Sequence, residues 1–116
     1  MSRANPLRIA DYLQHILEAI GNIQEYCAGM DRETFVADRK TRDAVIRNLE
    51  VIGEACNKVA KNHPDFVARH SNVPWGFAYE MRNALSHGYF VVDHAIVWQT
   101  TQQDLPALKA QISAIS

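Results

Sequence analysis

Apolar residues recur in a helical rhythm along three long stretches of the chain. In the first stretch, about residues 6 to 27, they alternate in steps of four and three, at Ile9, Leu13, Ile16, Ile20, Ile23 and Cys27. This spacing is typical of the apolar face by which a helix packs into a bundle. Pro6 suits a first helical turn, and Gly29 favours an end soon after residue 27. We therefore predict a first long helix over residues 6–27.

The second stretch repeats this rhythm between residue 38 and Pro64. Its apolar positions are Val45, Leu49, Ile52, Cys56 and Val59. The residue before a proline disfavours the helical conformation, so this helix should stop before Pro64. Asp31 is the expected cap of a short helix around residues 32–36, and residues 61–74 contain enough breakers to predict an irregular segment.

The third stretch forms the C-terminal part of the chain. Its seam positions are Trp98, Thr101, Leu105, Leu108, Ile112 and Ile115. Because the rhythm continues across Pro106, we predict one helix kinked at this proline, with a break and restart as the alternative. We expect Asp93 to cap this helix at its start. Before it, we predict an extended connection over residues 89–92 and a further helix over residues 77–87. The pattern predicts an all-α, up-and-down helical bundle forming a single domain over residues 1–116.

Composition narrows the possible functions. The formal net charge is -1, so no broad basic surface can hold nucleic acid, and any RNA contact has to be local. Cys27 and Cys56 both fall on apolar stripes, which predicts buried free thiols suited to a reducing cytoplasm. Neither a signal sequence nor a membrane span is recognisable, and the histidines lack metal-ligand spacing. We expect a cytoplasmic protein without a metal, a cofactor or a membrane partner.

Residues 81–90, MRNALSHGYF, contain the strongest candidate chemistry. Arg82 is followed after four residues by His87 and then, after one more, by Tyr89. Arginine matches phosphate oxygens with a permanent planar cation, and histidine exchanges protons near neutral pH. On a regular helix the side chains of Arg82 and His87 would point about 140° apart. For both to reach one phosphate, a second copy of the motif or a last helical turn loosened at Gly88 is needed. The motif predicts phosphodiester chemistry.

Four blocks in order connect this motif to a known family. They are TRDAVIRNLEVIGEACNKV at residues 41–59, VPW at 73–75, MRNALSHGYF at 81–90 and IVWQTTQQDLPALKAQI at 96–112. With them the chain resembles the HepT-like toxins of the HEPN superfamily, which are encoded beside a small nucleotidyltransferase antitoxin of the MntA type. The resemblance implies an all-α homodimer whose two motifs meet in a cleft. It also implies metal-independent endoribonuclease activity on an RNA substrate.

The resemblance assigns roles to individual residues. Arg82 would bind the scissile phosphate, His87 would act as general acid or base, and Asn83 would bind phosphate or support the site. Tyr89 occupies the position at which the antitoxin adenylylates HepT-like proteins and blocks them. Glu54 is a candidate for orienting Arg82, and the alternative for Glu54 is an ordinary surface pair four residues from Lys58.

The chain departs from the family pattern directly after the VPW block. Gly76 and Phe77 stand where an arginine and an acidic residue are usual. This departure keeps a second hypothesis open, in which the protein is a non-catalytic helical partner or regulatory subunit of a nucleotidyltransferase.

Several other polar and aromatic residues have simpler interpretations. Trp75 and Trp98 are expected in the core rather than stacked on bases. A basic run at the start of the second long helix is expected to be a solvated face, and four histidines are expected at the surface or with satisfied hydrogen bonds. These residues are Arg39, Lys40, Arg42 and Arg47, and His15, His63, His70 and His94.

Overall fold

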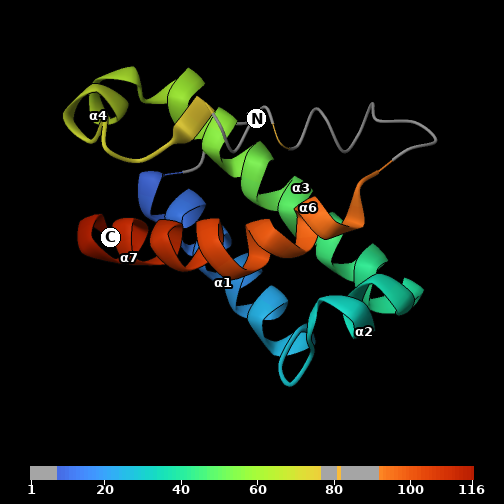
Figure 1. Cartoon of the computed structure of the whole chain (residues 1–116). Coiled ribbons are helices and arrows are strands. Elements are labelled where there is room, and N and C mark those ends of the chain that lie inside the picture. The colour runs from blue at the N-terminus through green and yellow to red at the C-terminus, as the bar shows by residue number, and fades with distance from the viewer. Residues whose placement is uncertain (1–7, 77–80, 82–91) are drawn as a thin grey trace.

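The computed structural model describes residues 8–76, 81 and 92–116, and it is built from helices (Figure 1). Their order is α1 (Ile9–Tyr26), α2 (Arg32–Ala37), α3 (Arg39–Asn62), α4 (Pro64–Arg69), α6 (His94–Gln99), the π-helical turn η1 (Thr100–Asp104) and α7 (Leu105–Ile115). The described residues contain no β-strand. The predicted all-α class is confirmed.

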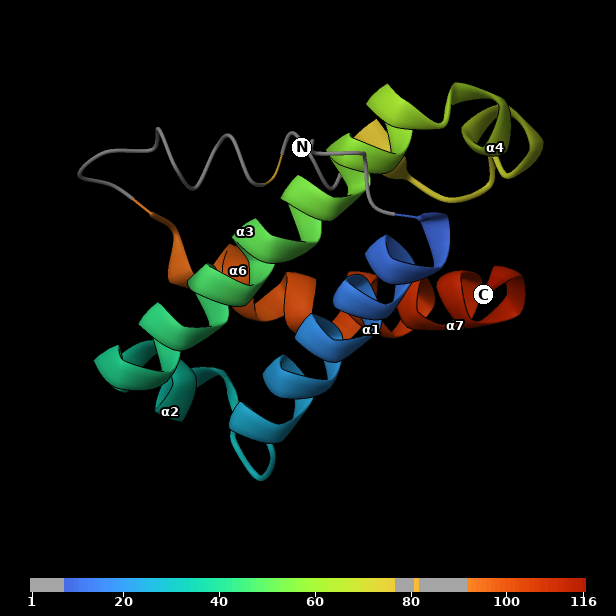
Figure 2. The same ribbon diagram turned by 180° about the vertical axis from the view of Figure 1, so that it is seen from behind.

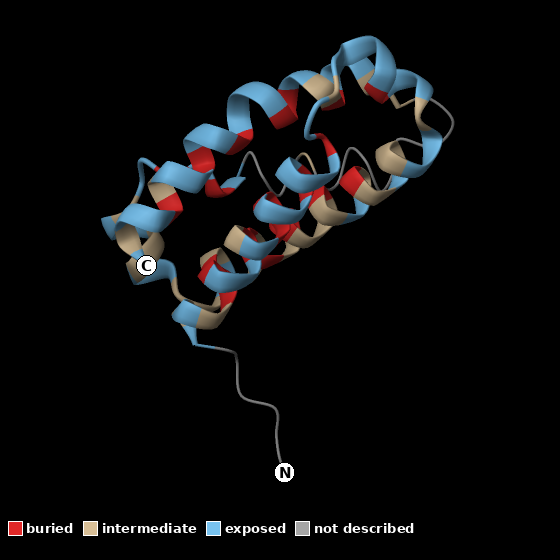
Figure 3. Cartoon of the chain, turned by 90° about the horizontal axis from the view of Figure 1, so that it is seen from below, coloured by how far each residue is buried: buried red, intermediate tan, exposed pale blue. Residues whose placement is uncertain are grey.

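The centre of the fold is the antiparallel pair of α1 and α3, which lie side by side in both views (Figures 1 and 2). The seam predicted for each helix is the face that it buries. The buried seam residues are Leu13, Ile16, Ile20 and Ile23 of α1, and Val45, Leu49, Ile52, Cys56 and Val59 of α3. Figure 3 shows the buried positions gathered on the faces that the helices turn towards one another. Regular amphipathic spacing therefore accounts for the part of the core that α1 and α3 form.

Side-chain caps define the helix starts at α2 and α3. Asp31 accepts a hydrogen bond from the Thr34 backbone N–H at 2.8 Å, and Thr34 Oγ1 accepts one from the Asp31 N–H at 2.9 Å. Asp38 accepts from the Thr41 backbone N–H at 3.0 Å. In each case the bond from the backbone N–H lowers the pKa of the capping carboxyl group. Both predicted helix starts are confirmed to within a residue.

The segment between α3 and Trp75 is more ordered than predicted. Residues 61–74 were expected to be irregular, but Pro64–Arg69 form the short helix α4 with Pro64 in its first turn. The same proline that ends α3 at Asn62 starts α4, because its fixed φ suits the first helical position and its missing N–H would have no partner there. Phe66 of α4 then packs its ring 6.3 Å from that of Trp75.

The C-terminal stretch is one continuous run, but its irregularity differs from the predicted kink at Pro106. The regular helical pattern stops before the proline, at η1, where the Leu105 N–H donates to the Thr100 carbonyl five residues back. Pro106 itself lies in the first turn of α7. A proline supplies no N–H to the carbonyl four residues before it and its ring clashes with that carbonyl, so the wider turn accommodates both effects.

The π-helical turn also changes which residue of α6 is buried. A regular helix would align Trp98 with Leu105, seven residues later, and the predicted seam used Trp98. Because a π-helical turn takes up one extra residue, Val97 moves into the seam instead. Val97 is 2% exposed, whereas Trp98 is half-buried and its ring lies 5.3 Å from that of Phe35. The seam prediction was wrong by one residue in α6.

Candidate functional site

The predicted catalytic motif lies almost wholly outside the described residues. Arg82, Asn83, His87 and Tyr89 belong to the part of the chain that is not described, as does the predicted helix over residues 77–87 except for Met81. The roles assigned to these four residues stay predictions. What the structure does describe is how the chain is held on both sides of them.

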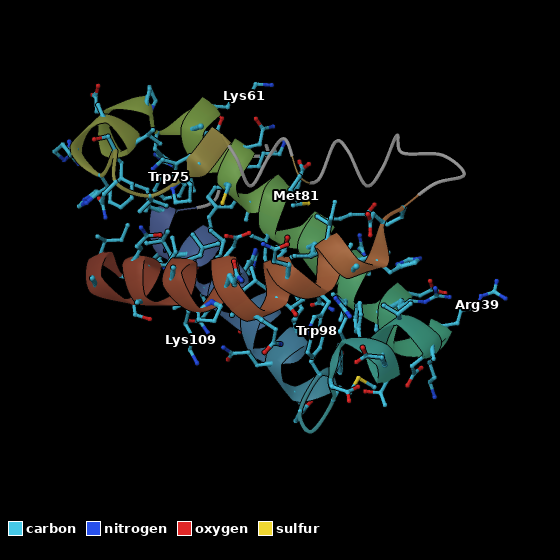
Figure 4. The ribbon with its side chains drawn as sticks, viewed as in Figure 1. Arg39, Lys61, Trp75, Met81, Trp98 and Lys109 are labelled. Carbon is cyan, nitrogen blue, oxygen red and sulfur yellow. The ribbon has the colours of Figure 1, made fainter. Side chains whose placement is uncertain are left out.

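Met81, the residue before Arg82, is partly buried beside the core. It lines a small apolar pocket of about 30 Å³ together with Leu49 and Ile52 of α3 and Leu105 and Leu108 of the C-terminal run. Met81 lies beside α3 in Figure 4. Methionine is flexible enough to fill such an irregular gap. The described residue next to Arg82 therefore faces the apolar side chains of α3 and of the C-terminal run.

The two flanks of the motif are fixed by different interactions. Upstream, Trp75 is 5% exposed and its indole N–H donates to the His70 carbonyl at 3.0 Å. Downstream, Asp93 Oδ1 accepts from the backbone N–H groups of Ala95 at 3.0 Å and Ile96 at 3.3 Å, which caps α6. The predicted cap at Asp93 and the predicted core position of Trp75 are confirmed. The chain is therefore held by hydrogen bonds at Trp75 and at Asp93, on either side of the motif.

Glu54 lies in the middle of α3 with its side chain 45% exposed. Its Oε2 is 3.8 Å from Lys58 Nζ, so the surface pair expected as the alternative is present. Its predicted contact with Arg82 involves a residue outside the described part of the chain. An exposed pair of this kind contributes little to stability.

A buried polar pair at the start of α3 and α6 departs from the sequence prediction. His94, expected at the surface or satisfied, is half-buried, and neither its Nδ1 nor Arg42 Nε has a hydrogen-bond partner. Burial, and next the charge of Arg42, lower the pKa of His94, so its neutral form is favoured. The other members of the basic run, Arg39, Lys40 and Arg47, are exposed as predicted.

A groove that sequence reasoning missed lies between α2 and the C-terminal run. We call it the α2–α6 groove, and its volume is about 450 Å³. The side chains that matter for its chemistry are Arg32 of α2 and Ile96, Trp98, Gln99, Gln102 and Gln103 of the C-terminal run. Figure 4 shows Trp98 between these two elements. The glutamine-rich QTTQQ segment was visible in the sequence, but its partner α2 is about 65 residues away along the chain.

Thiol chemistry has no support in the described structure. Both cysteines are free and buried, as predicted. Burial raises the pKa of the Cys56 thiol to about 12 and also raises that of Cys27. The thiolate is the reactive form, so both groups are poor nucleophiles.

In residues 8–76, 81 and 92–116, no cluster of three or more histidine, cysteine, aspartate or glutamate side chains is arranged to hold a metal ion. Among the same residues, no helix combines the length and apolar character needed to cross a membrane.

Comparison with known proteins places the chain among ribonuclease-related sequences. The family described as "Ribonuclease HepT-like" matches residues 16–115. A protein of Thermococcus cleftensis named "Probable ribonuclease HepT" is 43% identical over 90% of this chain and 93% of its own length. Proteins named "Putative RNase" from Caldanaerobacter subterraneus and Methanocaldococcus jannaschii are 38% and 34% identical over 90% of this chain, covering 90% and 93% of the relatives. The comparison with solved structures gave no match.

Proposed function

The chain belongs to the HepT-like ribonuclease family, and on that premise we propose that it is a metal-independent endoribonuclease with Arg82 and His87 as its catalytic residues. The observation that carries the proposal is the intact Arg-x4-His-x-Tyr motif inside the stretch matched by the family. Relatives named as ribonucleases cover nine-tenths of the chain. The partly buried position of Met81 and the hydrogen bond of Trp75 support it further, because a catalytic segment needs rigid flanks.

In the proposed reaction, one His87 removes the proton of a ribose 2′-OH. The 2′-oxygen then attacks the adjacent phosphorus while the bond to the 5′-oxygen breaks, and the His87 of a second copy protonates the leaving oxygen. Arg82 binds the phosphate oxygens and stabilises the charge that develops on them. Asn83 and Glu54 hold Arg82 and the phosphate in place. The products are a 2′,3′-cyclic phosphate and a 5′-hydroxyl end, which requires RNA and excludes DNA as a substrate.

A homodimer is part of this proposal. On a regular helix, Arg82 and His87 of one chain would point about 140° apart, which suits one phosphate poorly. Two motifs that meet across a dimer cleft supply two arginines and two histidines to the same phosphate. The separate acid and base that the reaction needs then come from two chains.

Control by a nucleotidyltransferase completes the proposed system. An MntA-type antitoxin in the cytoplasm transfers AMP from ATP to the Tyr89 hydroxyl, two residues from His87. The tyrosine oxygen bonds to the α-phosphorus and loses its proton while pyrophosphate leaves. The added phosphate is anionic and competes with RNA for Arg82, while its nucleoside fills the cleft. Inhibition therefore follows from the same electrostatic rules that govern phosphorylation. Intact-mass measurement after co-expression tests this step, and an unmodified tyrosine there would contradict it.

The catalytic assignment is tested by cleavage of single-stranded RNA with protein purified without its nucleotidyltransferase. His87→Ala should lower the rate about 10²- to 10⁴-fold, the usual contribution of general acid–base catalysis. His15→Ala, which removes an exposed histidine of α1, is the matched control and should cleave like the wild type. Chelator should leave the rate unchanged. Equal activity of wild type and His87→Ala, or no cleavage by either, would overturn the assignment.

One observation favours a second candidate, the non-catalytic partner of a nucleotidyltransferase. Gly76 stands where HepT-like proteins usually carry an arginine. A Cβ atom added at Gly76 would meet nothing within 4 Å, so Gly76→Arg can be made without a local clash. If the wild type binds the nucleotidyltransferase but leaves RNA intact, and Gly76→Arg restores cleavage, the chain is a partner that has lost an arginine needed for catalysis.

A further inference from the structure

The α2–α6 groove combines side chains that suit a nucleobase. It is an open groove of about 450 Å³, with the half-buried ring of Trp98 and the 54% exposed side chain of Ile96 on its apolar side. The exposed amides of Gln99, Gln102 and Gln103 give it a polar side. A nucleobase likewise has an apolar face and a polar edge.

Two of the glutamines present a hydrogen-bonding edge. Gln99 Nε2 donates to Gln103 Oε1 at 3.3 Å, which leaves Gln99 Oε1 as an acceptor and Gln103 Nε2 as a donor. If both amides are turned over, one acceptor and one donor still remain, so the pattern does not depend on how their oxygen and nitrogen atoms are assigned. Adjacent donors and acceptors of this kind read the edges of bases, as glutamine does with adenine.

The charges of the groove favour a base over a bare phosphate. Arg32 NH2 lies 3.2 Å from Glu33 Oε2, and both side chains are more than half exposed. The two charges largely offset each other, so the groove has no strong field for anions. Stacking on an aromatic ring and hydrogen bonds to amides do not need such a field. This explains how a chain of net charge -1 can hold RNA.

The position of the groove in the chain suits a contact with the substrate. α6 begins at His94, seven residues after the proposed catalytic His87. We propose that the α2–α6 groove binds a base of single-stranded RNA, with stacking on Trp98 and hydrogen bonds from Gln99 and Gln103. The inference rests on the proposed ribonuclease function.

The test measures binding of a fluorescein-labelled single-stranded oligoadenylate by anisotropy. All proteins carry His87→Ala, so that the RNA stays intact. Gln99→Ala/Gln103→Ala should raise the Kd about 3- to 10-fold, as expected for the loss of one or two hydrogen bonds. Gln14→Ala/Gln24→Ala, which removes two exposed glutamines of α1, is the matched control and should bind like the parent. Ultraviolet cross-linking followed by mass spectrometry should place the RNA on a peptide that contains Trp98.

The outcomes separate the groove from the catalytic proposal. If wild-type protein cleaves RNA and the groove variant binds RNA like its control, the groove inference fails and the ribonuclease function stands. If RNA binding depends on Gln99 and Gln103 but the wild type does not cleave, the function fails and the groove stands. If the groove variant instead weakens self-association or binding of the nucleotidyltransferase and leaves RNA binding unchanged, the groove is a protein contact and the inference is overturned.

Discussion

The α1–α3 pair and the C-terminal run from α6 to α7 show the same hydrophobic rhythm in the sequence but have different structures. α1 and α3 are uninterrupted helices whose predicted seams are buried. In the C-terminal run the rhythm passes through η1, which places Val97 in the core and leaves Trp98 at the edge of a groove. Periodicity therefore predicts which face is buried only while the hydrogen-bond pattern stays regular. Where one residue is added to a turn, a different side chain enters the core, and here Val97 does so in place of Trp98.

Deleting one residue from each region should give the largest difference. Removal of the exposed Arg47 from α3 would turn the helix after it by about 100° and expose Leu49, Ile52 and Cys56, so the protein should no longer unfold cooperatively. Removal of Gln102 from η1 should convert the C-terminal run into a regular α-helix. The buried faces of α6 and α7 should then stay aligned. Circular dichroism during heating checks both variants.

A substitution of Pro106 tests why the Gln102 deletion is costly. Without the extra residue, Pro106 would lie inside a regular helix, at a cost of about 3 kcal/mol. Adding Pro106→Ala to the Gln102 deletion should recover most of this loss in urea unfolding. If the two deletions are equally damaging, or if Pro106→Ala recovers nothing, our explanation of the π-helical turn is wrong.

A smaller effect is expected from truncating one isoleucine in each region. Ile20 of α1 is fully buried, and Ile20→Ala should lower the free energy of unfolding by about 2–5 kcal/mol. Ile96 of α6 is 54% exposed, and Ile96→Ala should change it by less than about 0.5 kcal/mol. Similar losses for both, measured by urea unfolding, would show that the groove side of α6 is packed in solution.

A smaller difference in stability is expected between serine substitutions of the two cysteines. Cys56 is fully buried inside α3, so Cys56→Ser buries a hydroxyl and should cost about 1–3 kcal/mol. Cys27 follows α1 and its side chain is hydrogen-bonded to Thr101 of η1, which could accept a serine hydroxyl as well. Cys27→Ser should therefore cost less. Chemical unfolding of both variants checks the order, and the reverse order would contradict it.

The smallest effect concerns pH and the start of α6. Burial and Arg42 lower the pKa of folded His94 below the value of about 6.5 expected in the unfolded chain. Its contribution to stability is complete above that pH and is lost as the pH falls towards the folded pKa, because the unfolded chain then binds a proton more readily. Asp43 and Asp93 oppose the shift but do not reverse it.

The measurement compares thermal midpoints at pH 7.5 and 5.5. The midpoint of His94→Gln should fall less than that of the wild type over this interval, and the exposed variant His15→Gln should behave like the wild type. A wild type that loses no more than His94→Gln would argue against a buried neutral histidine at the start of α6.

The candidate site was predicted from sequence to different extents in its two parts. The motif residues Arg82 and His87 could be named because catalytic chemistry needs particular side chains at short spacing, although they lie outside the described residues. The α2–α6 groove could not be named. Its residues come from elements about 65 positions apart, and tertiary packing, which includes the contact of Phe35 with Trp98, brings them together.

The sequence by itself determined the helical class, the seams of α1 and α3, the start of α3 near residue 38, the caps at Asp31 and Asp93, and the buried thiols. These depend on periodicity and on hydrogen bonds between residues close in the chain. The tertiary structure decided that residues 64–69 form α4 with Phe66 against Trp75, that η1 precedes Pro106, and that Val97 replaces Trp98 in the core. In these places several local arrangements have similar energies, and contacts with distant residues select one of them.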